Sequence, residues 1–169
     1  MIRQIPQWGT PDEWQEINRT LEYLLRRYEK DISRAMTLAR EIQNTLEEIF
    51  PIQDDLCLTT CMHCPDPCCL NATVWADFKD LLFFHLSNQT IPQKQLIEKP
   101  GDTCRYHTPK GCSLPRLSRP WTCTLYLCPP QKQTFRKFSS DLIRDYENKV
   151  DYIKKSRSEL EAIFLKLIT

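Results

Sequence analysis

Nine cysteines lie between residues 57 and 128, and they form two clusters in the sequence. The clusters read Cys57-x3-Cys61-x2-Cys64-x3-Cys68-Cys69 and Cys104-x7-Cys112-x10-Cys123-x4-Cys128. Thiolates are soft donors that bind zinc and iron–sulfur clusters well. A thiol that is exposed and unused is a liability because it oxidises. The clustering therefore predicts a metal site built from the sulfurs of both stretches.

The spacing of the cysteines indicates more than one metal centre. Cys61 and Cys64 are separated so that one turn can present two sulfurs to one metal. The side chains of the adjacent pair Cys68 and Cys69 point apart in an extended chain, so they suit two different ions. Eight cysteines fill two sites of four sulfurs, and Cys57 is then the spare one. The predicted ligands are Cys61, Cys64, Cys68, Cys69, Cys104, Cys112, Cys123 and Cys128.

The sequence leaves the metal open between iron–sulfur and zinc, with iron–sulfur slightly favoured. Zinc ribbons usually carry two Cys-x2-Cys knuckles, and this chain has one. The steps Cys64-Pro65 and Cys128-Pro129 are typical of ferredoxin clusters. Disulfides and inert buried cysteines are alternatives, but disulfides need an oxidising compartment. The pattern at 57–64 also matches radical SAM enzymes, whose scaffold needs more chain than the cysteine-bearing region offers.

At these residues the sequence resembles the YkgJ-type cysteine-cluster proteins, a family described as zinc- or iron-chelating. The resemblance covers about residues 57–130. It rests on Cys61-x2-Cys64-x3-Cys68-Cys69, Cys104-x6-Gly111-Cys112-Ser113-Leu114, Arg119-Pro120-x2-Cys123 and Tyr126-x-Cys128. It implies binding of a metal or an iron–sulfur cluster, and an accessory role in protein modification is conceivable. Here Pro65-Asp66-Pro67 stands where the family often has glycine, which makes that loop stiffer.

Several residues near the cysteines are candidates for supporting roles. Arg119, in the matched stretch, is expected to donate to cluster sulfurs or to neutralise their charge, and Tyr126 is expected to contact the cofactor. His63, His85 and His107 are expected in loops, in the core or behind the ligands rather than on the metal. Aromatic side chains are expected to keep water from the site; they are Trp75, Tyr106, Trp121 and Tyr126. No catalytic residue is predicted, and whether the chain is an enzyme stays open.

A long helix is expected over residues 11–50, before the cysteines. Thr10, Pro11 and Glu13 form a helix start with a capping box. The apolar residues that follow alternate in steps of three and four, with one extra step of four between Tyr28 and Ile32. They are Trp14, Ile17, Leu21, Leu24, Tyr28, Ile32, Ala35, Ala39, Ile42, Leu46 and Ile49.

A second long helix is expected over residues 140–168, capped by Ser139 or Ser140. Its apolar face, with Arg157 in the seam, needs a partner helix. The predicted fold is therefore mainly α: a single domain, 1–169, in which two long terminal helices pair antiparallel and an irregular cysteine-rich module, 57–130, is inserted between them. Within the module we expect a short helix begun by Asn71 or Thr73 and a short strand near 95–97.

Composition excludes several classes of function. The net charge of +1 gives no reason to expect nucleic acid or an anionic membrane as partner. Three glycines leave no phosphate-binding loop. No apolar run has the length of a membrane span or a signal-peptide core, so a cytoplasmic location is expected. The favoured function is a redox or accessory protein, and the alternatives are a zinc-stapled module whose helical rod docks a protein or a second copy of the chain, and an oxygen-sensitive metal enzyme.

Overall fold

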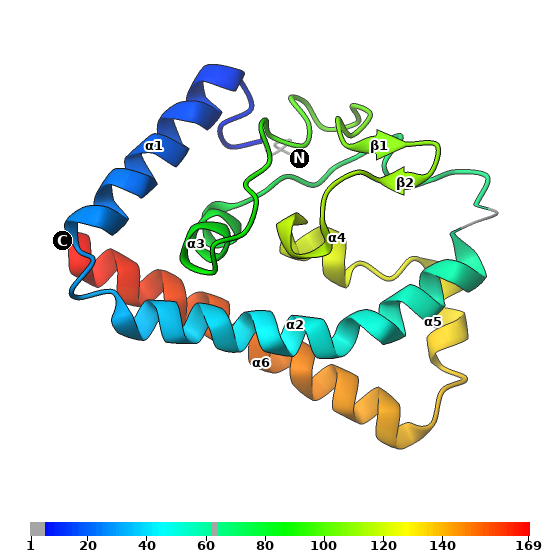
Figure 1. Ribbon diagram of the computed structural model, residues 1–169. Helices are drawn as coiled ribbons and strands as arrows, with labels where there is room; N and C mark the ends of the chain where they lie inside the picture. The colour runs from blue at the N-terminus through cyan, green and yellow to red at the C-terminus, as the bar shows by residue number, and fades with distance from the viewer. Residues whose placement is uncertain (1–5, 62–63) are drawn as a thin grey trace, which may run out of the picture.

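The computed structural model describes residues 6–61 and 64–169. Within these residues the chain is mainly helical, as predicted (Figure 1). Its α-helices are α1 (Pro11–Arg27), α2 (Ser33–Thr60), α3 (Phe78–Leu86), α4 (Trp121–Leu125), α5 (Pro129–Phe135) and α6 (Ser140–Ile168). A short 3-10 helix, η1 (Arg116–Ser118), and a two-stranded hairpin, β1 (His107–Thr108) and β2 (Gly111–Cys112), lie between α3 and α4.

Helices α2 and α6 form the predicted antiparallel pair. Three polar contacts along the pair run in opposite chain directions: Arg34 to Glu159 at 3.0 Å, Glu41 to Tyr152 at 2.9 Å and Glu48 to Lys149 at 3.0 Å. Between these exposed contacts the apolar seams of both helices are buried in one core; the seams include Ile42, Leu46, Ile49, Ile153, Leu160 and Phe164. The core formed by this pair is the base on which the cysteine-bearing region lies.

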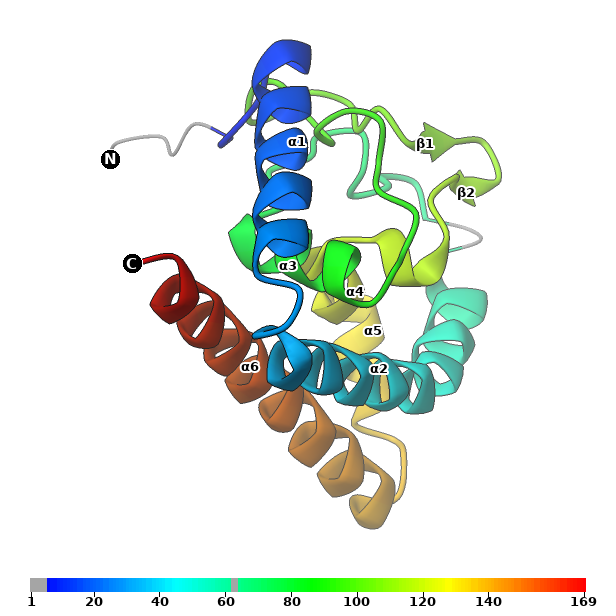
Figure 2. The ribbon, with the colours of Figure 1, turned by 60° about the vertical axis from the view of Figure 1, so that its left-hand side comes forward.

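The helix predicted over 11–50 is broken into α1 and α2, so its extent was wrong. Thr10 and Glu13 form the predicted capping box at the start of α1. The break covers residues 28–32, where the apolar spacing has its extra step. After it the two helices diverge, because α1 packs on α3 rather than along α6; the indole nitrogen of Trp14 donates to the carbonyl of Pro92 at 2.7 Å. Figure 2 shows α1 standing over α3.

Helix α2 also continues past the predicted end at residue 50. Pro51 lies inside it and removes one backbone donor, and α2 bends along its length in Figure 1. The extension persists because its inner face is buried at Gln53 and Leu56. The Gln53 amide donates to the carbonyl of Thr124 at 2.5 Å and to the hydroxyl of Tyr146 at 3.2 Å. This extension carries Cys57 on helical backbone.

Two local predictions between the long helices were wrong. Helix α3 is capped by Asp77, in a capping box with Asp80, and not by Asn71 or Thr73. The segment 95–97 is no strand. The buried side chain of Gln95, rather than a neighbouring strand, makes hydrogen bonds to the backbone of Ala76. Its Oε1 accepts from the nitrogen of Ala76 at 2.8 Å, and its Nε2 donates to the carbonyl of the same residue at 3.0 Å.

No helix in the described parts of the chain combines the length and the apolar character that crossing a membrane requires.

Candidate metal centre

Backbone hydrogen bonds join the two cysteine-bearing stretches directly. The nitrogen of Cys104 donates to the carbonyl of Cys69 at 2.7 Å. Ala72 and Asp102 continue the pairing at 2.9 Å, and Gly101 donates to Ala72 at 2.8 Å. The chain turns tightly there, with Gly101 at a φ of 95°, which glycine adopts without strain. Cys69 and Cys104, which are far apart in the sequence, are therefore direct neighbours.

The hairpin β1–β2 adds Cys112 to these two. Cys112 pairs with His107, and the nitrogen of His107 donates to the carbonyl of Cys104 at 3.0 Å. The hairpin turn contains Gly111 at a φ of 105°. The sulfurs of Cys104 and Cys112 consequently lie within electrostatic range of each other.

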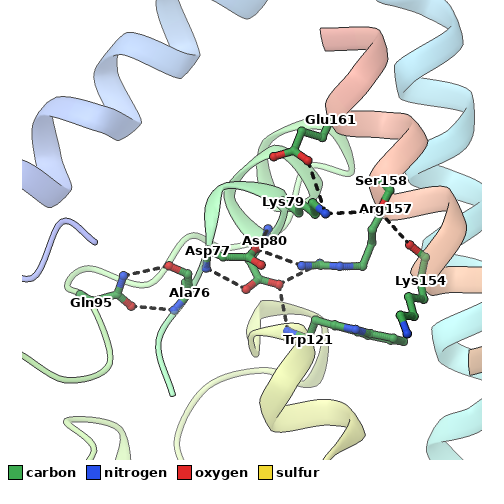
Figure 3. Close-up of polar contacts among 10 residues, drawn as sticks. All are labelled: Ala76, Asp77, Lys79, Asp80, Gln95, Trp121, Lys154, Arg157, Ser158 and Glu161. Carbon is green, nitrogen blue, oxygen red and sulfur yellow. Dashed lines mark hydrogen bonds and ion pairs between the residues drawn. The ribbon is translucent and has the colours of Figure 1, made fainter. Parts of the chain in front are cut away.

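A buried ion pair fixes α4, the helix that carries Cys123 (Figure 3). One carboxylate oxygen of Asp80 accepts from the backbone nitrogen of Trp121, at the start of α4, at 2.9 Å. The same oxygen lies 2.8 Å from the guanidinium of Arg157, which also binds Asp77 at 3.0 Å. Arg157 is 4% exposed and its guanidinium lies over the Trp121 ring. The position of Cys123 is thus set from the core.

Burial shifts the pKa of the Asp80 carboxyl more strongly than the neighbouring Arg157 guanidinium does. It raises the pKa of Asp80 to about 6, and the nearby Asp77 acts in the same direction. The Arg157 guanidinium and the two backbone donors oppose this rise in pKa. Contacts from α3, α4 and α6 thus favour the charged carboxylate and offset part of the effect of burial.

We name five cysteines on these segments and on α4 the loop group: Cys68, Cys69, Cys104, Cys112 and Cys123. The chain turns at Cys68, where the nitrogen of Leu70 donates to the carbonyl of Pro67 at 2.9 Å. The thiol of Cys69 can therefore donate to the sulfur of Cys68, which lowers the pKa of Cys68 to about 6 and raises the pKa of Cys69. The expectation of an extended chain at this pair was wrong, because the pair lies in a turn, and its division between two ions stays a prediction.

Two other members of the loop group, Cys104 and Cys123, are held as neutral thiols. The protein around Cys104 and Cys123 displaces water and raises the pKa of both thiols, although part of Cys123 reaches solvent. Neighbouring sulfurs of the group raise both pKa values further. Sulfurs that disfavour one another's negative charge are stabilised together by a bound cation.

Three further cysteines, the helix-end group, lie around the amide of Gln131: Cys57, Cys61 and Cys128. The Gln131 Nε2 lies 3.6 Å from the sulfur of Cys57 and 3.5 Å from that of Cys61. Its Oε1 accepts from the nitrogen of Cys128 at 3.1 Å, where Cys128 caps α5. Cys64 follows one turn beyond Cys61, and its nitrogen donates to the Cys61 carbonyl at 3.2 Å.

The donor set fits a soft metal in chemistry. All nine cysteines are free thiols. As placed, no three His, Cys, Asp or Glu side chains within 6–61 and 64–169 lie close enough to hold one ion. The two groups thus supply soft donors, but their side chains would have to move before they could surround a metal.

Comparison with known proteins adds nothing to this geometry. No family model, curated protein or solved structure matches the chain.

The supporting residues predicted from the sequence are placed in different ways. Arg119 directs its Nε to the carbonyl of Leu114 at 3.1 Å, and the Tyr126 side chain is 54% exposed. His85 lies away from the cysteines, with Nε2 2.9 Å from Asn18 Oδ1, whereas His107 lies in the hairpin with Cys112. The expectation for His63 falls outside the described residues.

The sequence reasoning missed the buried polar residues that organise the region. Gln53, Asp80, Gln95 and Gln131 are each at most 6% exposed, and each contacts backbone or sulfur of the cysteine-bearing part. Their only signal in the sequence is a polar residue at an apolar position. For Gln53 and Gln131 this signal can be recognised only when α2 and α5 are known to include these positions.

Proposed function

We propose that the chain binds an iron–sulfur cluster or zinc through its cysteine thiolates and serves a partner as a redox or accessory protein. The observation that carries the proposal is the hydrogen bond from Cys104 to Cys69, which joins the two cysteine stretches. The loop group around that bond gathers five free thiols on three separate segments. Such convergence of soft donors suits a soft metal.

The ligands we propose are the eight cysteines of the predicted pattern: Cys61, Cys64, Cys68, Cys69, Cys104, Cys112, Cys123 and Cys128. A bound iron–sulfur cluster would supply one-electron transfer, whereas zinc would supply cross-linking of the irregular segments. The chain's own residues position these sulfurs: Asp80 holds α4, and Gln131 holds the cysteines around it. Thiols stay reduced, and therefore able to bind a metal, in a reducing compartment. We therefore propose that the protein works in the cytoplasm.

A second candidate function is a zinc-stapled module that docks another protein through its helices. The observation favouring it is a set of large apolar side chains exposed on the long helices: Tyr23, Met36, Leu142, Tyr152 and Leu165. These residues give a partner, or a second copy of the chain, apolar surface to cover. This function predicts a colourless protein with zinc, whereas the first predicts a coloured protein with iron.

The test is purification of the full chain without oxygen, followed by iron and zinc analysis and a visible spectrum. We expect either iron with a visible absorption that bleaches on reduction, or zinc without colour. Cys61→Ser and Cys104→Ser, one from each stretch, should each lose metal, and the neighbouring Thr103→Ser should retain it. A folded wild-type chain without either metal, or one with its cysteines paired as disulfides, would refute the proposal.

A further inference from the structure

The geometry points to Cys57 as a further sulfur ligand of the metal site, held with Cys61 by the amide of Gln131. This inference rests on the proposed function, and it changes the ligand set predicted from the sequence, in which Cys57 was spare.

The continuation of α2 past Pro51 places Cys57 and Cys61 on one face. Residues four apart on a helix are neighbours, and here both sulfurs lie within hydrogen-bonding distance of the same nitrogen, Nε2 of Gln131. Had α2 ended at Pro51, nothing would fix Cys57 relative to Cys61. The helix therefore presents two sulfurs together on the same side, toward α5.

Gln131 recognises both sulfurs in one fixed orientation. Its side chain is buried, at 6% exposed, and its Oε1 is engaged by the backbone N–H of Cys128. A flipped amide would set its NH2 group against that N–H, so the observed orientation is the one that satisfies both ends. The two N–H donors of Nε2 then face the sulfurs of Cys57 and Cys61.

Donors aimed at sulfur have a known purpose at thiolate sites. N–H groups that point at cysteine sulfurs orient metal ligands and stabilise their negative charge. A spare thiol does not need a buried amide directed at it, whereas a metal ligand does.

Including Cys57 changes how the sulfurs divide. The helix-end group together with Cys64 then offers four sulfurs, the number that one tetrahedral zinc or one cubane cluster takes. The loop group keeps five, so the surplus sulfur belongs to that group. Cys68 and Cys69, which are adjacent in one turn, are where one sulfur can remain unliganded.

The first test uses the wild-type chain, so it does not depend on a variant folding. The metal-loaded protein is treated briefly with a maleimide, without oxygen, and each cysteine is quantified by peptide mass spectrometry before and after chelation. We expect Cys57 and Cys61 to be protected together and to be labelled together once the metal is removed. Labelling of Cys57 in the loaded protein while Cys61 stays protected would overturn the inference and leave the proposed function intact.

The second test measures metal content in matched variants. Cys57→Ser should lose the metal of the helix-end group, about half of the total if both groups hold equal amounts, and Thr59→Ser should lose none. Gln131→Glu keeps the acceptor for Cys128 but replaces the donors to sulfur by a charged oxygen, so the same metal should bind more weakly to a competing chelator. Gln133→Glu, exposed on the same helix, is the charge-matched control.

The outcomes separate the two proposals. Full metal content in Cys57→Ser, with unchanged chelator resistance in Gln131→Glu, would refute the role of Cys57. The proposed function would stand. A folded wild-type chain that takes up neither iron nor zinc would refute the proposed function, and this inference with it.

Discussion

Asp80 and Arg157 form a buried ion pair, with carboxylate and guanidinium 2.8 Å apart. The oxygen of Asp80 that faces Arg157 also receives the backbone N–H of Trp121, so α3, α4 and α6 meet at a single atom. This contact connects the helical core to the start of α4. The thiol of Cys123 lies on α4, two residues after Trp121. The stability of the core and the position of a proposed ligand depend on the same contact.

Replacement of Arg157 by methionine should destabilise the protein by about 3–5 kcal/mol, because it leaves the Asp80 carboxylate buried without its charge partner. Urea unfolding followed by circular dichroism measures this loss. Arg34→Met removes an exposed ion pair with Glu159 and should cost at most about 1 kcal/mol. Equal losses in the free energy of unfolding from the two substitutions would show that the buried ion pair stabilises the protein no more than the exposed one.

Replacement of Gln95 by methionine should lower the free energy of unfolding by at least about 1–3 kcal/mol, since the backbone groups of Ala76 lose their buried partners. Thermal unfolding measures the change. Gln93→Met, at an exposed position two residues earlier, is the control and should be nearly neutral. A neutral Gln95→Met would mean that the segment 72–77 is held without this amide.

The stability should depend on pH through His85. Burial lowers the pKa of His85 from 6.5, although Glu22 acts in the opposite direction. Its contribution to stability is therefore complete above pH 6.5 and is lost as the pH falls through the lower pKa of the folded state. His85→Gln removes this titration, so the stability difference between wild type and variant should shrink as the pH falls.

Urea unfolding of wild type and His85→Gln at matched pH values measures this difference, and contributions common to both proteins cancel. His107→Gln leaves His85 in place and should keep the wild-type trend. A difference that grows with acidity would contradict the predicted direction of the pKa shift.

Removal of the proposed metal should loosen the cysteine-bearing region before the helical pair. The segments 64–77 and 101–128 contain few regular elements, whereas α2 and α6 share a buried apolar seam. Hydrogen–deuterium exchange of the loaded protein, with and without a chelator, should therefore change in those segments and little in the middle of α2 and α6. Equal loss of protection throughout would mean that the metal stabilises the whole molecule.

Much of the helical framework was predictable because its signals are local. Thr10, Pro11 and Glu13 mark a helix start through contacts within one turn, and Ser139 caps α6 by donation from Leu142 to its hydroxyl. The antiparallel pairing follows from two amphipathic helices that each need a partner. Arg157 was recognised as a charged residue in an apolar seam, but its partners, Asp77 and Asp80, come from α3.

The remaining features depend on contacts between distant segments. The break at 28–32 arises because α1 packs on α3, and the passage of α2 through Pro51 is stabilised by Gln53, which binds α4 and α6. No local pattern contains this information. For the same reason Cys57 was judged spare: its relation to Gln131 spans more than seventy positions of the chain.

The pairing of α2 with α6 joins helices that lie far apart in the sequence, with every cysteine from Cys61 to Cys128 in between. Contacts of such long sequence separation close late in folding. Until α6 docks, Arg157 is absent from Asp80, and α4 lacks its final anchor. A nascent or truncated chain would therefore keep its thiols accessible, so the proposed metal would enter most easily before α6 docks.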